Sequence, residues 1–176
     1  MNCTRVLCCF TVVFLLAALT GCAYTTKNGL PARLKTIAIP VFDNKSYYHD
    51  YTRKIEVEVS DAVRKTFVQT GELKLAGRED ADLILEGEVT GIDREILRQD
   101  RFGDPAEVRY VVKARISLYD VKEAKYLLKN TLVTSAEGKG EAGVYNLRRG
   151  ESDDLGRQKA VEDLGRLIAR HVVEKW

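Results

Sequence analysis

The sequence contains little cysteine and histidine, and the positions of these few residues limit its chemistry. Of the 4 cysteines, only Cys22 lies beyond the first nine positions, so removal of an N-terminal leader leaves no cysteine pair to form an intramolecular disulfide. The 2 histidines, His49 and His171, stand far apart. No serine-hydrolase elbow, zinc-protease motif, phosphate-binding loop or paired-cysteine motif is present. We therefore expect no enzyme activity, no metal and no cofactor.

An excess of one charge is also lacking. The chain has 28 Lys and Arg against 26 Asp and Glu, a formal net charge of +2. A nucleic-acid-binding domain usually has a marked basic excess, so no nucleic acid partner is expected. There is no internal repeat and no low-complexity tract. Without a leader, about 155 residues remain, which suits one domain with its own hydrophobic core.

Residues 1–21 have the pattern of a secretory leader. Arg5 supplies a positive charge, and Val6–Leu19 is an uncharged apolar run. This run is shorter than the roughly 20 residues of a membrane-spanning helix, and small residues follow it, as at a signal-peptide cleavage site. The sequence LTGC at 19–22 resembles the bacterial lipobox, in which the cysteine receives a diacylglyceryl group and becomes the first mature residue. An ordinary signal peptide with an incidental cysteine is the alternative.

Acylation of Cys22 would anchor the protein to a membrane. It would cap the lone thiol, and two or more acyl chains such as palmitate anchor stably where one chain binds only marginally. Ala23 stands where an aspartate signals retention in the inner membrane of some bacteria, so the outer membrane is favoured. We expect residues 22–33 to be the lipidated N-terminus and a short tether, and residues 34–176 to be a single domain.

Hydrophobic periodicity predicts two helices. Apolar residues recur at helical spacing from Thr52 and stop at Gly71. A second helix should begin near Asp153, where two acidic residues favour a helix N-terminus. Its apolar stripe is formed by Ala160, Val161, Leu164, Leu167, Ile168 and Val172.

Period-two alternation predicts the strands. It is clearest in Leu83–Ile92 and Val108–Leu118, and the sequence FGDP at 102–105 should join these as an antiparallel hairpin. Pro40 indicates an edge position or a bulge in the first strand. Further strands are expected at Leu34–Phe42, Leu73–Ala76 and Tyr126–Thr134, with loops at Asp43–Tyr51 and Ser135–Ser152, the second of them mobile.

These elements indicate an α+β two-layer sandwich, with a mostly antiparallel sheet of about four strands and two helices packed on one face. The opposite face should be exposed to water or to a partner. Its charged residues are Glu86, Glu88, Arg109, Lys113 and Arg115.

Four stretches of the sequence resemble the LptE family of lipopolysaccharide-assembly lipoproteins. They are GCAY at 21–24, KTIAIPVFDNKS at 35–46, ADLILEGEVTGI at 81–92 and ISLYDVKEAKYLL at 116–128. Their order and spacing follow the family across most of the mature chain. The family more often has glycine at the position of Ala23.

The resemblance implies a lipoprotein of the outer membrane that faces the periplasm and plugs the lumen of the β-barrel LptD. Such a protein assists assembly of the barrel and delivery of lipopolysaccharide to the outer leaflet, and a charged sandwich surface suits a polar barrel interior. An outer-membrane lipoprotein that activates a peptidoglycan synthase is the alternative. A tether of about ten residues, at most roughly 35 Å long, favours a partner within the membrane. A periplasmic hydrolase is a third possibility, for which no residue can be named.

Lipopolysaccharide carries phosphate groups, which basic side chains beside an aromatic ring could bind. The candidates for contact with lipopolysaccharide or the barrel are Arg94, Arg98, Arg101 and Phe102 around the hairpin, and Lys113 and Arg115 on the exposed face. In the alternative interpretation, which is favoured for any single residue, these cations pair with acids across the strands. Such pairs contribute less than about 1 kcal/mol each.

Overall fold

The computed structural model describes residues 31, 33–46, 54–137 and 141–174. The predicted leader, Cys22, most of the tether and His49 lie outside these residues. Neither helix of the described chain combines the length and apolarity that crossing a bilayer requires. The elements are β1 Thr36–Ala38, β2 Asp43–Asn44, α2 Ile55–Thr70, β3 Lys74–Leu75, β4 Leu83–Gln99, β5 Pro105–Asp120, β6 Lys125–Thr134, β7 Val144–Asn146, the 3-10 helix η1 Leu147–Arg149 and α3 Asp153–Glu174.

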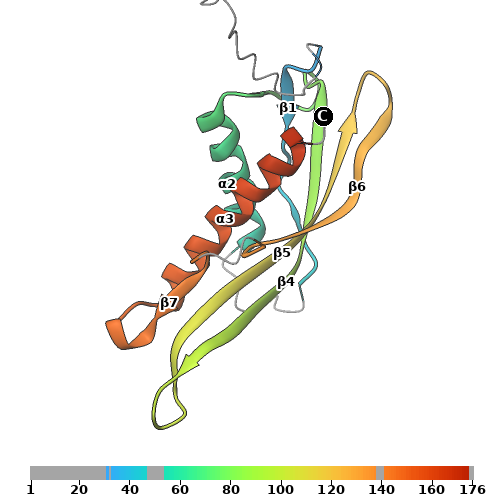
Figure 1. The fold of residues 1–176 in the computed structure, drawn as a ribbon. Coiled ribbons are helices and arrows are strands. Elements are labelled where there is room, and N and C mark those ends of the chain that lie inside the picture. The colour runs from blue at the N-terminus through green and yellow to red at the C-terminus, as the bar shows by residue number, and fades with distance from the viewer. Residues whose placement is uncertain (1–30, 32, 47–53, 138–140, 175–176) are drawn as a thin grey trace, which may run out of the picture.

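The fold is α+β, with both helices on one side of an open sheet (Figure 1). The sheet has seven strands and is mixed, so the expected sheet of about four mostly antiparallel strands is wrong. Its order is β3-β1-β4-β5-β6, with β2 paired to β4 and β7 paired to β5. The predicted β4–β5 hairpin is confirmed, but β1 and β2 run parallel to β4, and β1 runs parallel to β3. A parallel pair needs a crossover connection, and α2 provides it between β1 and β3.

The strand predicted at Leu34–Phe42 is interrupted. β1 ends at Ala38, the chain leaves the sheet, and β2 begins at Asp43. Pro40 lies in the gap, where its missing N–H leaves no ladder bond unmade. The loop predicted at Asp43–Tyr51 is therefore wrong at its first two residues, which form β2, and positions 47–51 lie outside the described residues.

Side chains from α2 bind the backbone that leaves the sheet in this gap. The Arg64 guanidinium donates to the Ile39 carbonyl, with Nη2 at 2.7 Å and Nε at 3.0 Å. The Ser60 hydroxyl oxygen accepts from the Phe42 N–H at 2.8 Å. Buried backbone polar groups need such partners, so α2 both supplies the crossover and satisfies the interrupted strand.

Both helices occur where the periodicity predicts them. α2 ends at Thr70, and Gly71 caps it in the left-handed region at φ 68°, with its N–H donating to the Phe67 carbonyl. α3 begins at Asp153, and all six residues of its predicted stripe are buried. The stripe and the buried face of α2 form one apolar core with the sheet.

A glycine allows the two helices to cross closely. A Cβ atom added at Gly165 of α3 would lie 2.9 Å from the backbone carbonyl carbon of Ala62 in α2, closer than real Cβ contacts. The helix layer therefore depends on the absence of a side chain at this position.

The segment Ser135–Ser152, expected to be a mobile loop, contains ordered elements. β7 pairs with β5, with Tyr145 opposite Val108, and η1 follows directly. The Tyr145 ring is buried, and its hydroxyl donates to Asp153 at 2.7 Å. Burial and this hydrogen bond raise the pKa of Tyr145 to about 12. Glycine and charge frequency gave no sign of this strand because it is short and its partner is distant in sequence.

Candidate functional site

The β4–β5 hairpin extends beyond the helices that cover the rest of the sheet (Figure 1). β4 has 17 residues and should span about 55 Å. α3 has 22 residues and should span only about 33 Å. The seven residues Asp93–Gln99 at the far end of β4 are all exposed. We call residues 94–107 the distal arm.

The turn of the distal arm is organised by Asp100. Its Oδ1 atom accepts from the Phe102 N–H at 2.7 Å and the Asp104 N–H at 3.0 Å. Its other oxygen pairs with Arg148 of η1. The hydrogen bond from Phe102, with further help from Arg148, lowers the pKa of the Asp100 carboxyl below its usual value. This turn presents the Phe102 ring to solvent, with 73% of the residue exposed.

The cations of the distal arm differ in their partners. Arg94 pairs with Asp153 of α3 at 2.6 Å, and Arg98 pairs with Glu107 across the hairpin at 3.4 Å. Arg101 makes no ion pair with any residue that the structure describes, and its guanidinium carbon lies 4.7 Å from the centre of the Phe102 ring. Arg101 and Phe102 are therefore the cation and the ring that remain available at the tip.

Lys113 and Arg115 lie apart from this group. They are on the sheet face opposite the helices, where Lys113 pairs with Asp93 at 2.6 Å and Arg115 with Glu88 at 2.7 Å. From Glu107, the partner of Arg98, to Arg115 is eight positions along β5, or about 26 Å. The six candidate residues thus form a tip group and a mid-sheet group. Three of the five cations, Arg98, Lys113 and Arg115, make the cross-strand ion pair that the alternative interpretation expects, whereas Arg94 pairs with helix α3 instead.

The mid-sheet ion pairs form a ladder across β4 and β5. Arg109 pairs with Glu95 at 3.5 Å, next to the pairs of Lys113 and Arg115. Glu88 also binds Lys45 at 3.1 Å, and the hydrogen bonds from Lys45 and Arg115 lower the pKa of its carboxyl. This face presents paired charges, which suits a polar surrounding.

The sequence interpretation missed the residues of η1. Leu147, Arg148 and Arg149 are exposed beside the distal arm, and the Arg148–Asp100 ion pair joins the two segments. A local signal existed: Asn146 accepts hydrogen bonds from the Arg148 and Arg149 N–H groups as an N-cap, and Gly150 ends the turn at φ 76°. An Asn and a Gly flanking three residues indicate a short helical turn.

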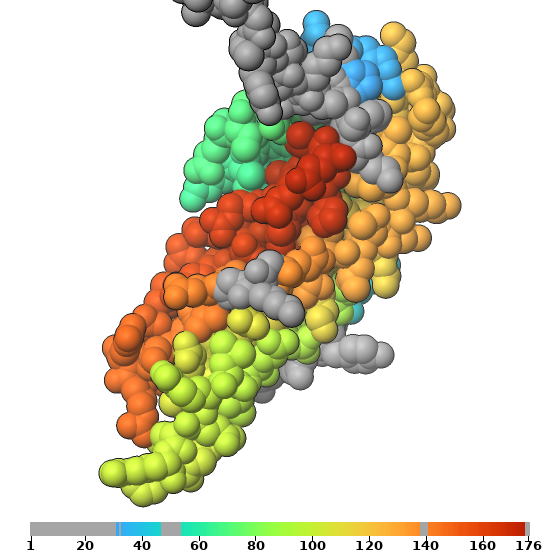
Figure 2. Space-filling view, in the orientation of Figure 1, coloured from blue at the N-terminus to red at the C-terminus, as the bar shows by residue number. Residues whose placement is uncertain are grey.

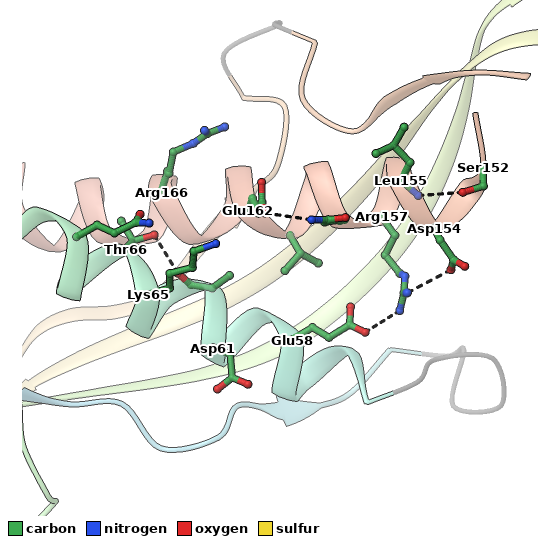
Figure 3. A pocket seen from close by; sticks show the side chains of 14 residues that line it. Glu58, Asp61, Lys65, Thr66, Ser152, Asp154, Leu155, Arg157, Glu162 and Arg166 are labelled. Carbon is green, nitrogen blue, oxygen red and sulfur yellow. Dashed lines mark hydrogen bonds and ion pairs between the residues drawn. The ribbon is translucent and has the colours of Figure 1, made fainter. Parts of the chain in front are cut away.

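A groove of about 820 Å³ lies between α2 and α3 (Figure 3). Arg157 crosses it and binds Glu58 at 2.8 Å and Asp154 at 3.2 Å. The other lining side chains carry both signs of charge. This groove therefore offers a mixed polar surface.

The described residues that could otherwise be considered for catalysis or metal binding lie in positions with a structural role. His171 lies at the edge of α3 and faces Glu137 at 3.6 Å. Asp153 and Asp154 stand in the first turn of α3, as expected of residues that favour a helix start. Among the described residues, no group of three or more His, Cys, Asp or Glu side chains is placed to hold a metal ion.

The described chain is a helix-covered sheet with a projecting, charged hairpin. The model of the LptE family, described as lipopolysaccharide assembly, matches residues 34–175. The chain belongs to the LptE family, as its sequence motifs predict. The family consists of outer-membrane lipoproteins with a non-enzymatic role in lipopolysaccharide assembly, and that role extends to this protein.

Solved structures share the fold at low sequence identity. A hypothetical protein of Chlamydia trachomatis, CT253, is 9% identical with a TM-score of 0.51, and the match covers 80% of this chain and 99% of that one. The protein XCC0632 of Xanthomonas campestris is also 9% identical, with a TM-score of 0.50 and coverage of 80% and 84%. These likenesses concern the fold alone. The comparison with curated proteins returned no match.

Proposed function

We propose that this lipoprotein occupies the lumen of an LptD-like outer-membrane β-barrel, assists its assembly and helps to deliver lipopolysaccharide to the outer leaflet. The family match over residues 34–175 carries the proposal. The ladder of ion pairs on the sheet face opposite the helices supports it, because a barrel interior is polar and accepts a surface of paired charges.

The N-terminal region provides the anchor in this proposal. Residues 1–21 are removed, Cys22 is acylated, residues 22–33 form the tether, and residues 34–176 form the single LptE-like domain. The family match begins at Leu34, which supports this boundary. Cys22→Ala should leave the fold intact and release the protein from the membrane unless the barrel retains it. Membrane fractionation with circular dichroism of the purified variant checks this, and a misfolded variant would contradict a purely anchoring role.

The distal arm is the part that contacts lipopolysaccharide in this proposal. Arg101 offers a cation without a competing acidic partner among the described residues, and Phe102 offers an exposed ring beside it. A phosphorylated lipid has both an anionic head and apolar chains, so this combination suits it. Arg94 and Arg98 would have to exchange an existing carboxylate partner for a phosphate, and Lys113 and Arg115 lie too far from the tip to share its ligand.

A pull-down tests the proposal directly. The tagged protein is recovered from mildly solubilised outer membranes, and the bound proteins are identified and quantified by mass spectrometry. A large β-barrel in equal amount is the expected result. Recovery of a peptidoglycan synthase would favour the alternative partner, and recovery of no partner would contradict the plug.

A further inference from the structure

The tether enters the domain at the end of the sheet opposite the distal arm. Arg33 donates to the buried carboxylate of Asp120 at 2.7 Å and also pairs with Glu123. The N–H and hydroxyl of Thr36 donate to Asp82 at 3.0 Å and 2.9 Å. The chain is therefore fixed to the sheet from Arg33 onward, beside the turn that joins β5 to β6. We call this region the proximal end.

A second apolar cluster occupies the proximal end, on the sheet face away from the helices. Ala38, Ala81 and Ile84 are buried there, and Tyr119 packs against them. The Tyr126 ring meets the Tyr119 ring edge to face, with centroids 5.1 Å apart. This cluster shares no residue with the main core. It therefore packs the outer surface of the proximal end and lies outside the helix–sheet interface.

The outer side of this cluster is exposed and basic. Tyr126 is 48% exposed and Val121 is 41% exposed. The Lys129 ammonium lies 5.7 Å from the centre of the Tyr126 ring. Lys122 in the adjoining turn and Lys125 at the start of β6 are exposed. Glu123 pairs with Lys125, and the nearby carboxylate of Asp120 is paired with Arg33. We call Val121, Lys122, Lys125, Tyr126 and Lys129 the proximal patch.

We propose that, in the lipoprotein that has not yet entered a barrel, the proximal patch rests on the headgroup layer of the membrane that holds the lipid anchor. This inference depends on the proposed acylation of Cys22. Tyrosine favours the membrane–water interface, and lysines bind anionic headgroups while their apolar stems lie along the surface. A patch with a ring, an exposed valine and an excess of lysine has this chemistry, and it stands where the tether enters.

The length of the tether indicates that the surface in contact with the proximal patch is the membrane. The eleven residues from Ala23 to Arg33 span at most about 40 Å when fully extended. The proximal end is thus held near the bilayer surface, whereas the tip of the distal arm lies about 50 Å further along the sheet. The domain would stand on its proximal end and point the distal arm away from the leaflet that carries the anchor, as the opposite positions of β1 and the hairpin tip in Figure 1 permit. Figure 2 shows β6 next to the N-terminal described residues on this end of the surface.

Fluorescence quenching in reconstituted vesicles tests the orientation. The full-length lipidated protein, with Trp176→Phe as background, carries either Tyr126→Trp in the proximal patch or Phe102→Trp at the distal tip. Both are reconstituted into phosphatidylethanolamine and phosphatidylglycerol vesicles that contain a lipid with a nitroxide on its headgroup. We expect at least threefold stronger quenching at position 126 than at position 102, and Lys129→Glu should reduce it.

Flotation of the same vesicles separates the two proposals. Vesicle-bound protein with unquenched tryptophan at position 126, or with equal quenching at both positions, overturns the membrane contact and leaves the anchor standing. Protein that does not float shows that the anchor itself is wrong, and the membrane contact fails with it. Val121→Trp provides a second probe in the same turn if Tyr126→Trp impairs folding.

Discussion

The two halves of the β4–β5 hairpin have the same backbone structure and opposite surroundings. In the half under the helices, Leu83, Leu85 and Leu118 are fully buried. In the distal arm, Ile96 is 53% exposed and Phe102 is 73% exposed. The stability of the domain must therefore come from the covered half, since burial of an apolar side chain contributes about 1.5–3 kcal/mol and exposure contributes none. The distal arm keeps its shape through strand pairing and through Arg148 and Asp153, so its surface can serve recognition.

A matched pair of aromatic truncations, one in the core that covers the hairpin and one in the distal arm, should give the largest difference in stability. Phe67→Ala removes a fully buried ring from the core and should lower the free energy of unfolding by about 3–5 kcal/mol. Phe102→Ala removes an exposed ring and should change it by less than about 0.5 kcal/mol. Urea unfolding of both variants measures this. A large loss from Phe102→Ala would show that the arm is part of the folding core.

The helix crossing provides the next largest effect. Gly165→Val adds a branched side chain where even a Cβ atom meets the backbone of Ala62, and it should cost about 1–3 kcal/mol because the helices must separate. Gly77→Val is the control, since a Cβ atom at Gly77 meets nothing within 4 Å. Equal stability of the two variants, measured by thermal unfolding, would contradict close packing of α2 on α3.

The covered half was largely predictable from sequence because its residues repeat with the period of their element. The stripe of α3 and the alternation of β5 both result from one-sided burial, which periodicity detects directly. The direction of β1 and the pairing of β7 were not predictable in this way. Three-residue strands have too few positions for a period, and their partners are chosen by tertiary contacts such as Arg64 with Ile39 and Tyr145 with Asp153.

The sequence predicted which residues are candidates for ligand contact, but it did not predict which of them lie together. The turn sequence at 102–105 correctly located Arg101 and Phe102 at a hairpin tip. The alternation of β5 correctly assigned Lys113 and Arg115 to the outer face, yet it could not show that they pair with acids of β4. Register across a hairpin decides such pairs, and a bulge between Val89 and Gly91 shifts it.

Acid should affect the two ends of the sheet differently. Asp82 at the proximal end and Asp100 at the distal tip both have lowered pKa values, mainly because backbone N–H groups of Lys35 and Phe102, respectively, donate to them. A carboxyl whose folded pKa is below its unfolded value of about 3.9 stabilises the fold above that pH and loses this contribution as the pH falls.

Asp82 joins Thr36 of β1 to the start of β4, so its protonation should lower the melting temperature of the whole domain. Asp100 orders the exposed turn and pairs with Arg148 of η1, both of which lie outside the covered core, so its protonation should leave the melting temperature nearly unchanged. Asp82→Asn should therefore show a smaller drop in melting temperature between pH 7 and pH 3 than the wild type, and Asp100→Asn should show the wild-type drop. If Asp100→Asn showed the smaller drop instead, the distal arm would contribute more to the stability of the domain than the proximal end.

The smallest effect on stability should accompany the largest effect on ligand binding. Arg98→Glu with Arg101→Glu reverses two exposed charges of the distal arm, and the ion pair it removes, Arg98 with Glu107, is exposed enough to contribute less than about 1 kcal/mol. The melting temperature should thus stay close to that of the wild type, while lipopolysaccharide binding, measured by titration of the purified domain, should weaken at least fivefold. Lys65→Glu with Lys74→Glu is the matched control, because it reverses the same number of charges and both lysines are exposed cations that make no ion pair with any described residue. If this control weakens binding equally, the effect comes from net charge and the distal arm has no special role. If neither variant changes binding, the arm is excluded as the contact, and the mid-sheet cations Lys113 and Arg115 become the next residues to reverse.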